Sequence, residues 1–358
     1  MSLDAPVNDS PTAIDTPLPS DGPVSDTSPP GATPAKLALK LAKVPPFPAV
    51  AVKLLSLLSD ESKSFSEIAA CIATDPALSG RLINRANAAD IMSYCEVATV
   101  LQAVSTLGME RTREISLTIA TAVYARAAIQ SETLQACWHH TLASALIAGE
   151  LARLCGMRPA ENYTAGLLHD IGRLGLITAY PAEYEKLLAD SSKPQIELER
   201  EAFGVDHLQA GPLLAREWEL PASLVDIIAH HAQPPAGPMT EVRLVHMACR
   251  LAGLLDFPAD GADAPGTFDE IAASLPDVVR SRLSSQLPAV KAAIEREIGL
   301  FKAAPNTPQE EAEKAEEPPP PEAPDDPAPR KSRMAARFVI AAGILVLLSV
   351  AAFLLFHH

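Results

Sequence analysis

The sequence contains few aromatic residues and little of the alternation that β-strands need. Aromatic residues make up 4% of the 358 residues, and runs in which Val or Ile alternate with polar residues are rare. Such alternation is the main sequence signature of a half-buried strand. Alanine and leucine are abundant instead, and both have high helix propensity. The composition therefore argues against a sheet protein and predicts an all-α fold.

The five cysteines do not form a pattern typical of a disulfide framework. Cys71, Cys95, Cys137, Cys155 and Cys249 are scattered along the chain without a CxxC pair, and their number is odd. The first residues, MSLDAPVNDSPT, carry no basic segment followed by an apolar run, which is the mark of a secretory signal. We therefore expect reduced thiols in a cytoplasmic domain.

The chain also lacks a basic surface suited to nucleic acid. Its net charge is −15, but much of this charge lies in two tails. Residues 1–34 carry five aspartates and no lysine or arginine, and residues 305–328 carry eight acidic residues against one lysine. Acidic tails of this kind are usually solvated segments that repel themselves. The part between them shows no extended basic patch, so we expect no nucleic-acid partner.

Both tails have the composition of segments without a packed core. Residues 1–35 are rich in Pro, Ser, Thr and Asp and are predicted to form a disordered tail. Residues 303–336 are predicted to form a Pro/Glu-rich linker followed by a basic juxtamembrane segment. Nine prolines fall between residues 303 and 329, so polyproline stiffness and like charges should extend this linker.

One long hydrophobic run follows the linker. Residues 338–356, FVIAAGILVLLSVAAFLLF, contain no charged residue, and as a helix they would span roughly 28 Å, close to the hydrocarbon thickness of a bilayer. A buried core helix is the alternative, but Ser349 alone gives it no polar stripe. We predict a transmembrane helix over residues 337–356. Arg330, Lys331 and Arg333 precede it, which by the positive-inside rule leaves the N-terminal bulk in the cytoplasm.

The region between the tails shows repeated helix start and stop signals. Ser64 and Glu67 have the spacing of a capping box. Asp75 followed by Pro76 is typical of an N-cap and first helical position. Gly108 is placed to end one helix before the next begins. These signals predict an array of helices.

The two helices around Gly108 could also suggest a helix-turn-helix DNA reader. The second of them, however, carries Glu110 and Glu114 beside Arg111 and Arg113. A mixed face of this kind does not favour contact with phosphates. Plain helix packing is the better interpretation.

Seven of the nine histidines fall between residues 139 and 246, and one of them precedes an aspartate in LLHDIGRLGL. Histidine nitrogens and carboxylate oxygens are common metal ligands. Adjacent side chains on a helix diverge by about 100°, so His169 and Asp170 converge on one site only where the helix ends or kinks. Gly172 makes such a break conceivable. The alternative is a buried pair whose members satisfy each other's hydrogen bonds.

Several motifs together carry a family resemblance. WHHT, LLHDIGRLGL, FGVDHLQAG and a late HH pair, preceded by PPFPAVAVKLLSLL and IAACIATDPALSGRLINRANAA, resemble the HDOD domain, a branch of the HD superfamily of metal phosphohydrolases. The resemblance spans about residues 40–250. It implies an HDOD-type helical array, with an N-terminal helical subdomain over 36–130, an HD-like helical subdomain over 131–250 and closing helices over 251–302.

The HD pattern asks for a first His, a His-Asp pair and a late Asp around one metal. The resemblance assigns the first His to His140, with His139 as the alternative register, and the pair to His169 and Asp170. The late Asp is expected within VHMACRLAGLL, where this chain has Cys249. One carboxylate of the pattern is therefore missing.

Relatives that cleave cyclic di-GMP, the HD-GYP proteins, add further groups to this pattern. They have a Lys after the His-Asp pair, another His, a His-His-Glu motif and a Gly-Tyr-Pro loop. This chain has Arg173 and His207 at the first two places, lacks the Glu after its His-His pair and has no Gly-Tyr-Pro. The resemblance leaves a divalent metal (Fe, Mn or Mg) open as a cofactor, with the following candidate ligands: His140, His169, Asp170, His207, His230 and His231.

Two functional hypotheses remain. The first is a bacterial signal-transduction scaffold, tethered to the cytoplasmic face of the inner membrane, that binds signalling proteins or a nucleotide second messenger. The second is a metal-dependent phosphohydrolase that acts on a nucleotide. Metal hydrolysis needs an open coordination position and a base that activates water. Because Cys249 replaces the late carboxylate, we favour the scaffold and expect no catalytic residue. His246 has no motif and is expected to lie outside the site.

Overall fold

The computed structural model describes four stretches of the chain and one isolated residue: 41–58, 60, 62–88, 97–259 and 266–303. The chain divides into one compact unit over residues 1–304 and a second over 305–358, and all described residues belong to the first. Every regular element within the described stretches is a helix. The expected all-α fold is confirmed for this part of the chain.

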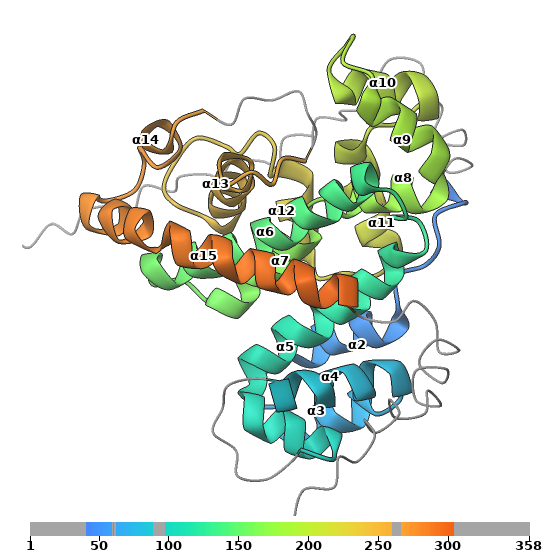
Figure 1. Ribbon diagram of the computed structural model, residues 1–358, viewed down its shortest axis with the longest axis vertical. Coiled ribbons are helices and arrows are strands. Elements are labelled where there is room, and N and C mark those ends of the chain that lie inside the picture. The colour runs from blue at the N-terminus through green and yellow to red at the C-terminus, as the bar shows by residue number, and fades with distance from the viewer. Residues whose placement is uncertain (1–40, 59, 61, 89–96, 260–265, 304–358) are drawn as a thin grey trace, which may run out of the picture. The chain divides into compact units, whose positions relative to one another are not determined.

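The described helices are, in order, α2 (Ala49–Leu58), α3 (Phe65–Ile72), α4 (Pro76–Ala88), α5 (Val100–Arg126), α6 (Glu132–Cys155), α7 (Pro159–Leu168), α8 (Ile171–Ala179), α9 (Pro181–Ala189), α10 (Gln195–Phe203), α11 (His207–Glu217), α12 (Ala222–His230), α13 (Glu241–Leu254), α14 (Phe268–Ile271) and α15 (Asp277–Ala303). Figure 1 shows α2, α3 and α4 gathered around α5, and α15 running beside α6 and α7.

The predicted helix signals act where the sequence places them. Ser64 and Glu67 form a reciprocal capping box at the start of α3. The carboxylate of Asp75 accepts hydrogen bonds from the amides of Ala77 and Leu78, both at 3.0 Å, at the start of α4. Gly108 has φ 77° and ψ 170°, so α5 is two helical segments joined at a sharp kink. A residue with a Cβ would be strained at this φ.

Two hydrophobic cores hold the helices together. The larger core joins α2–α5 to α6, α7, α8, α11 and α12. Within it the ring of Phe47 stacks on Trp218 with centroids 5.5 Å apart, and Tyr124 meets both rings edge-on. The smaller core lies between α6, α13, α14 and α15. Helix α6 contributes to both cores, so it is the central support of the site described below.

Helix α15 also reaches back to the first helices. Its Glu297 accepts a hydrogen bond from Arg85 of α4, and Arg111 of α5 lies 3.9 Å from the same carboxylate. Glu297 and Arg85 are largely buried. This contact ties the end of the described chain to its beginning.

Among the described residues, no helix combines the length and the apolar character that crossing a bilayer requires. The predicted transmembrane helix over 337–356 lies outside the described residues, as do the N-terminal tail and all of the linker beyond residue 303. The predictions for these segments stay predictions.

Candidate functional site

The helical run that contains the His-Asp pair is interrupted at the pair itself. Helix α7 ends at Leu168, His169 is its C-cap, and Asp170 has φ −107° and ψ 32° immediately before α8 begins. Because the helix breaks here, the adjacent side chains of His169 and Asp170 both line one pocket. Such a break is the condition expected from the sequence for their convergence. His169 and Asp170 are both buried.

Gly172 has a different function from the one expected. A Cβ on Gly172 would lie 2.1 Å from the carbonyl oxygen of His207 and 2.6 Å from the amide nitrogen of Gly211. The residue therefore allows α8 and α11 to meet backbone to backbone, while the helix break lies just before it. This close approach brings His207, the first residue of α11, to the carboxylate of Asp170.

A pocket of about 400 Å³ opens at this junction. Its polar lining comes from α6, the α7–α8 break, α10, α11, the end of α12 and α13, and consists of His140, His169, Asp170, Arg173, Gln195, His207, His231, His246, Cys249 and Arg250. The structure thus brings together five of the six predicted ligands. His140, and not His139, lines the pocket. Cys249 lines it as well, where the late carboxylate was expected.

His230 does not belong to the pocket. It is the last residue of α12, its side chain is 55% exposed, and Nδ1 lies 3.0 Å from Oδ1 of Asp226 on the same helix. Because neighbouring side chains on a helix point about 100° apart, His231 can face the pocket only if His230 faces away. The prediction of His230 as a ligand is corrected for this reason.

Four of the pocket imidazoles, that of His246 included, share one arrangement in which Nδ1 faces a backbone carbonyl oxygen. Nδ1 of His140 lies 2.9 Å from the carbonyl oxygen of Phe257. Nδ1 of His169 lies 2.7 Å from the carbonyl oxygen of Gly166, and Nδ1 of His231 lies 3.0 Å from that of Ile228. A carbonyl oxygen only accepts hydrogen bonds, so each Nδ1 carries the proton and donates it. The lone pair of each neutral ring is therefore on Nε2. Metal-ligating histidines are commonly oriented in this way.

Two of these rings, those of His169 and His231, are neutral because the pocket is buried. Burial, with help from the neighbouring His231, holds the pKa of His169 well below its ordinary value. Burial likewise lowers the pKa of His231 to about 4. The ring centroid of His169 lies 5.6 Å from that of His140 and 4.9 Å from that of His231. At neutral pH, His169 and His231 thus present uncharged ring nitrogens close to His140.

Asp170 uses one carboxylate oxygen and leaves the other without a hydrogen-bond partner among the described residues. Nε of Arg173 donates to Oδ2 at 2.5 Å, while Oδ1 is buried and lies 4.0 Å from Nε2 of His207. Burial alone would raise the pKa of Asp170, but Arg173 and then His207 lower it far below its usual value. The carboxylate is ionised, and Oδ1 remains able to accept a donor or a cation.

Behind Asp170 lies a buried polar network that the sequence did not reveal. Nδ1 of His207 lies 2.7 Å from Oε2 of Glu199. The other carboxylate oxygen of Glu199 accepts a hydrogen bond from the hydroxyl of Tyr184. Arg173 donates to Nε2 of His207 at 3.2 Å and to the hydroxyl of Tyr184 at 3.3 Å. Both ring nitrogens of His207 are thereby engaged by protein groups.

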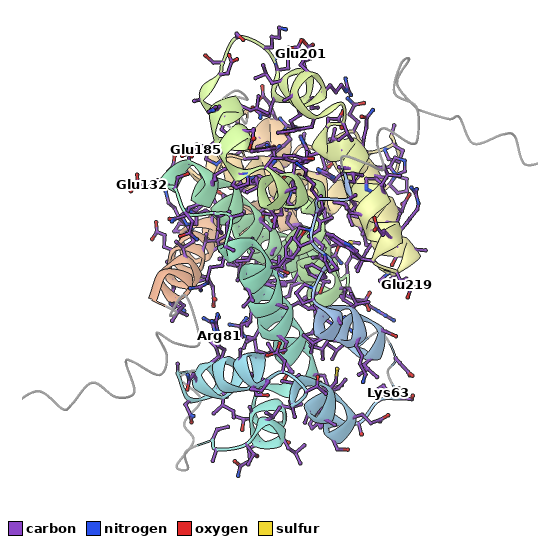
Figure 2. All side chains as sticks on the ribbon, turned by 90° about the vertical axis from the view of Figure 1, so that its right-hand side faces the viewer. Lys63, Arg81, Glu132, Glu185, Glu201 and Glu219 are labelled. Carbon is purple, nitrogen blue, oxygen red and sulfur yellow. The ribbon has the colours of Figure 1, made fainter. Side chains whose placement is uncertain are left out.

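Glu199 illustrates why this network was missed. It lies in ELEREAF, which has the acidic composition of a solvated helix face. Figure 2 shows Glu201, two residues on, at the surface together with Glu132 and Glu219. Glu199 is fully buried on the opposite side of α10. His246 was also missed: its Nδ1 donates to the carbonyl oxygen of His231 at 2.8 Å, which places it in the pocket wall.

The donor set fits one metal ion and does not fit two. One nitrogen each of His140 and His169 and Sγ of Cys249 lie within 4.8 Å of one another. A second ion would need His207, whose nitrogens are occupied, and would have to lie beside the guanidinium of Arg173. The positive charges of a second ion and of the Arg173 guanidinium would repel each other strongly in a buried site.

Comparison with known proteins establishes the family. The model of the HDOD domain matches residues 44–234, more than half of the chain. The protein belongs to the HDOD family. The match begins before α2 and ends just after the His230–His231 pair, so it includes α2–α12 and most of the pocket residues.

One curated relative of this HDOD protein is distant in sequence. An uncharacterized protein of Treponema pallidum (strain Nichols) is 25% identical over 211 residues, which is 57% of this chain and 40% of that protein. The chain therefore spans well under half the length of this curated relative.

Solved structures show the same fold. An HDOD domain protein of unknown function from Geobacter sulfurreducens has a TM-score of 0.61 at 22% identity and covers 73% of this chain and 97% of its own. A protein from Shewanella amazonensis SB2B, provisionally named a phosphohydrolase, has a TM-score of 0.58 at 24% identity, with 75% and 98% covered. A third, from Marinobacter aquaeolei VT8 and provisionally named a signal transduction protein, has a TM-score of 0.60 at 22% identity, with 74% and 61% covered. At these identities the likeness establishes the helical HDOD fold.

Proposed function

We propose that this HDOD protein is a regulatory binding module of a bacterial signalling pathway and not a phosphohydrolase. The observation that carries the proposal is the position of Arg173. Its guanidinium holds Oδ2 of Asp170 and Nε2 of His207 at once, and all three side chains are buried. Two of the groups that metal hydrolysis would use are thereby bound by a permanent cation.

Arg173 keeps its positive charge, so a change of pH does not release Asp170 and His207 from it. Burial alone would lower its pKa, but Asp170 and the other acidic groups around it raise the pKa well above its ordinary value. A guanidinium is not deprotonated in proteins. It therefore remains a fixed positive charge that a second divalent ion would have to approach.

One ion in the pocket would be held by His140, His169 and Cys249, and such an ion acts as a Lewis acid when bound. Hydrolysis also needs a base that activates water. Among the described residues the pocket is lined by one carboxylate, that of Asp170; Arg173 keeps it ionised with a pKa far below neutrality, so it is a weak base. The arrangement supports binding more than turnover.

The pocket is nevertheless suited to a small polar ligand. It is lined by the cationic side chains of Arg173 and Arg250 and by the amide of Gln195, whose Nε2 is buried without a hydrogen-bond partner among the described residues. Such groups could contact the phosphates of a nucleotide second messenger. A regulatory ligand of this kind, or a signalling protein that senses the state of the pocket, is the partner we propose.

A membrane tether forms the second part of the proposal. The uncharged run over residues 338–356 and the basic residues before it support a single-pass anchor in the inner membrane, with the HDOD domain in the cytoplasm. The Pro-rich linker would then hold the domain at a distance from the bilayer. This arrangement would restrict the search for partners to the membrane surface.

Phosphohydrolase activity is the second candidate, and the name of the Shewanella amazonensis protein of similar fold favours it. The test uses the full-length protein in mild detergent, incubated with Mn²⁺, Fe²⁺, Mg²⁺ or Zn²⁺ and with cyclic dinucleotides and nucleoside triphosphates. We expect no release of phosphate or linear product above the level of the Asp170→Ala variant. Metal-dependent turnover that is lost in Asp170→Ala would contradict the regulatory proposal.

A further inference from the structure

We propose that Cys249 makes this pocket a binding site for a single ion of the zinc class, held by His140, His169 and the thiolate of Cys249. The inference goes beyond the regulatory role, because it assigns the pocket a ligand set and a metal preference. It concerns binding alone and requires no reaction.

The three donors come from three separate elements that pack against one another. His140 lies in the middle of α6, Cys249 lies on α13, which packs directly on α6, and His169 lies at the break between α7 and α8. The donor atoms lie within 4.8 Å of one another. In a tetrahedral zinc site the donors are about 3.5 Å apart, so side-chain rotation has to bring them roughly 1 Å closer.

The backbone orients two of the donors in advance. His140 and His169 each donate Nδ1–H to a carbonyl oxygen, of Phe257 and Gly166 respectively. This fixes the tautomer in which Nε2 has the lone pair, and the hydroxyl of Ser144, 3.4 Å from Nε2 of His140, has to turn away when the metal binds. Groups that orient ligating imidazoles in this way contribute substantially to metal affinity.

Two further donors line the same pocket but lie outside the group of three, so either would have to move to become a fourth ligand. Oδ1 of Asp170 is buried without a hydrogen-bond partner among the described residues, and His231 has its ring 4.9 Å from that of His169. An orphaned, ionised carboxylate oxygen is costly in a buried site. A bound cation in the pocket would remove that cost.

The donor types decide the class of metal. Thiolate and imidazole favour zinc and similar borderline ions, whereas Mg²⁺ and Mn²⁺ favour carboxylate, carbonyl and water oxygens. The described lining of this pocket offers one unengaged carboxylate oxygen against several nitrogens and a sulfur. When the bond to the metal forms, the thiol of Cys249 releases its proton to solvent, and no oxidant or reductant is needed.

The probe is Co²⁺, which binds zinc sites and shows an intense sulfur-to-cobalt charge-transfer absorption in the near ultraviolet when a thiolate is a ligand. The full-length protein in mild detergent is stripped with a chelator and titrated with Co²⁺ and then Zn²⁺. We expect one equivalent of Co²⁺ to bind with the charge-transfer band and to be displaced by Zn²⁺ but not by Mg²⁺.

Two variants identify the ligand. Cys249→Ser should abolish the band and weaken Zn²⁺ binding at least about 100-fold. Cys155→Ser is the matched control, because Cys155 is another half-buried free thiol but does not line the pocket, and it should bind as the wild type does. Circular dichroism of each variant establishes that it is folded.

Three results would overturn the inference: no Co²⁺ bound by the wild type, Co²⁺ bound without the charge-transfer band, or unchanged Zn²⁺ affinity in folded Cys249→Ser. Metal binding without turnover supports both this inference and the regulatory role. Turnover by the metal-loaded protein contradicts the regulatory role alone, so the two proposals fail separately.

Discussion

Nε of Arg173 donates a hydrogen bond to Oδ2 of Asp170 at 2.5 Å, and the two side chains are only 5% and 4% exposed. They are three residues apart, one at the start of α8 and one a turn inside it. The pair engages Oδ2 of the carboxylate and sets a fixed positive charge where a second metal ion would have to bind. Its properties give the first prediction.

Arg173→Ala should lower the free energy of unfolding by about 3–5 kcal/mol, because it leaves the ionised carboxylate of Asp170 buried without its counter-ion. The double variant Asp170→Ala with Arg173→Ala should lose less than the sum of the two single losses. Urea denaturation of all three variants measures the coupling. Arg153→Ala, which breaks an exposed pair with Glu150, should cost less than about 1 kcal/mol. Additive losses at Asp170 and Arg173 would show that they are not partners.

Gly172→Ala should be strongly destabilising, because the added Cβ would lie 2.1 Å from the carbonyl oxygen of His207, a backbone atom that cannot rotate away. Gly80→Ala is the matched control. Gly80 lies within α4, nothing lies within 4 Å of its added Cβ, and alanine has the higher helix propensity. We expect Gly80→Ala to raise the free energy of unfolding by about 0.5–1 kcal/mol. Equal effects of the two substitutions in thermal denaturation would argue against the close contact of α8 and α11.

The chelator-treated protein should lose stability as the pH falls from about 6.5 to about 4. Burial lowers the pKa of His231 to about 4 in the folded protein, against an ordinary value near 6.5. The unfolded chain therefore binds more protons in this window, and protonation favours unfolding. His231 alone should contribute a loss on the order of 3 kcal/mol. His231→Gln should show a shallower slope of unfolding free energy against pH, whereas an unchanged slope would refute the shifted pKa.

Deletion of residues 337–358 should release the protein from membranes, because no helix of the described residues could span a bilayer and residues 338–356 are long and uncharged. Fractionation of cells that express the truncated protein, with a high-salt wash of the membranes, measures the release. Deletion of residues 1–35 is the control and should leave the protein in the membrane fraction. A C-terminally truncated protein that still sediments with washed membranes would contradict a single anchor.

The sequence predicted local structure well because local signals are short. The capping box of Ser64 and Glu67, the N-cap of Asp75 and the kink at Gly108 each depend on residues within one helical turn. His140, His169 and Asp170 were found through a family pattern in which the spacing of motifs is characteristic. These are the parts of the site that a reader of the sequence could place.

The rest of the site depends on contacts that no local pattern carries. Glu199 and His207 are eight residues apart, but their partners Tyr184 and Arg173 lie 15 and 34 residues earlier. His246 enters the pocket wall through the carbonyl oxygen of His231, 15 residues away. Helix periodicity cannot decide which face of α10 is buried when both faces carry acids. The hydrogen bonds of Glu199 to Tyr184 of α9 and to His207 of α11 decide it.

The chain contains two tryptophans, and the fold places them as natural optical reporters of different regions. Trp218 is stacked on Phe47 where α2–α5 meet the remaining helices, whereas Trp138 is fully buried on α6, two residues before His140. Two residues along a helix point to nearly opposite sides, so Trp138 faces the larger core and its fluorescence should report on the packing of α6 behind the pocket. The fluorescence of Trp218 should report on any separation of α2–α5 from the remaining helices. Single-tryptophan variants would show whether a ligand's signal stays at α6 or travels to the junction.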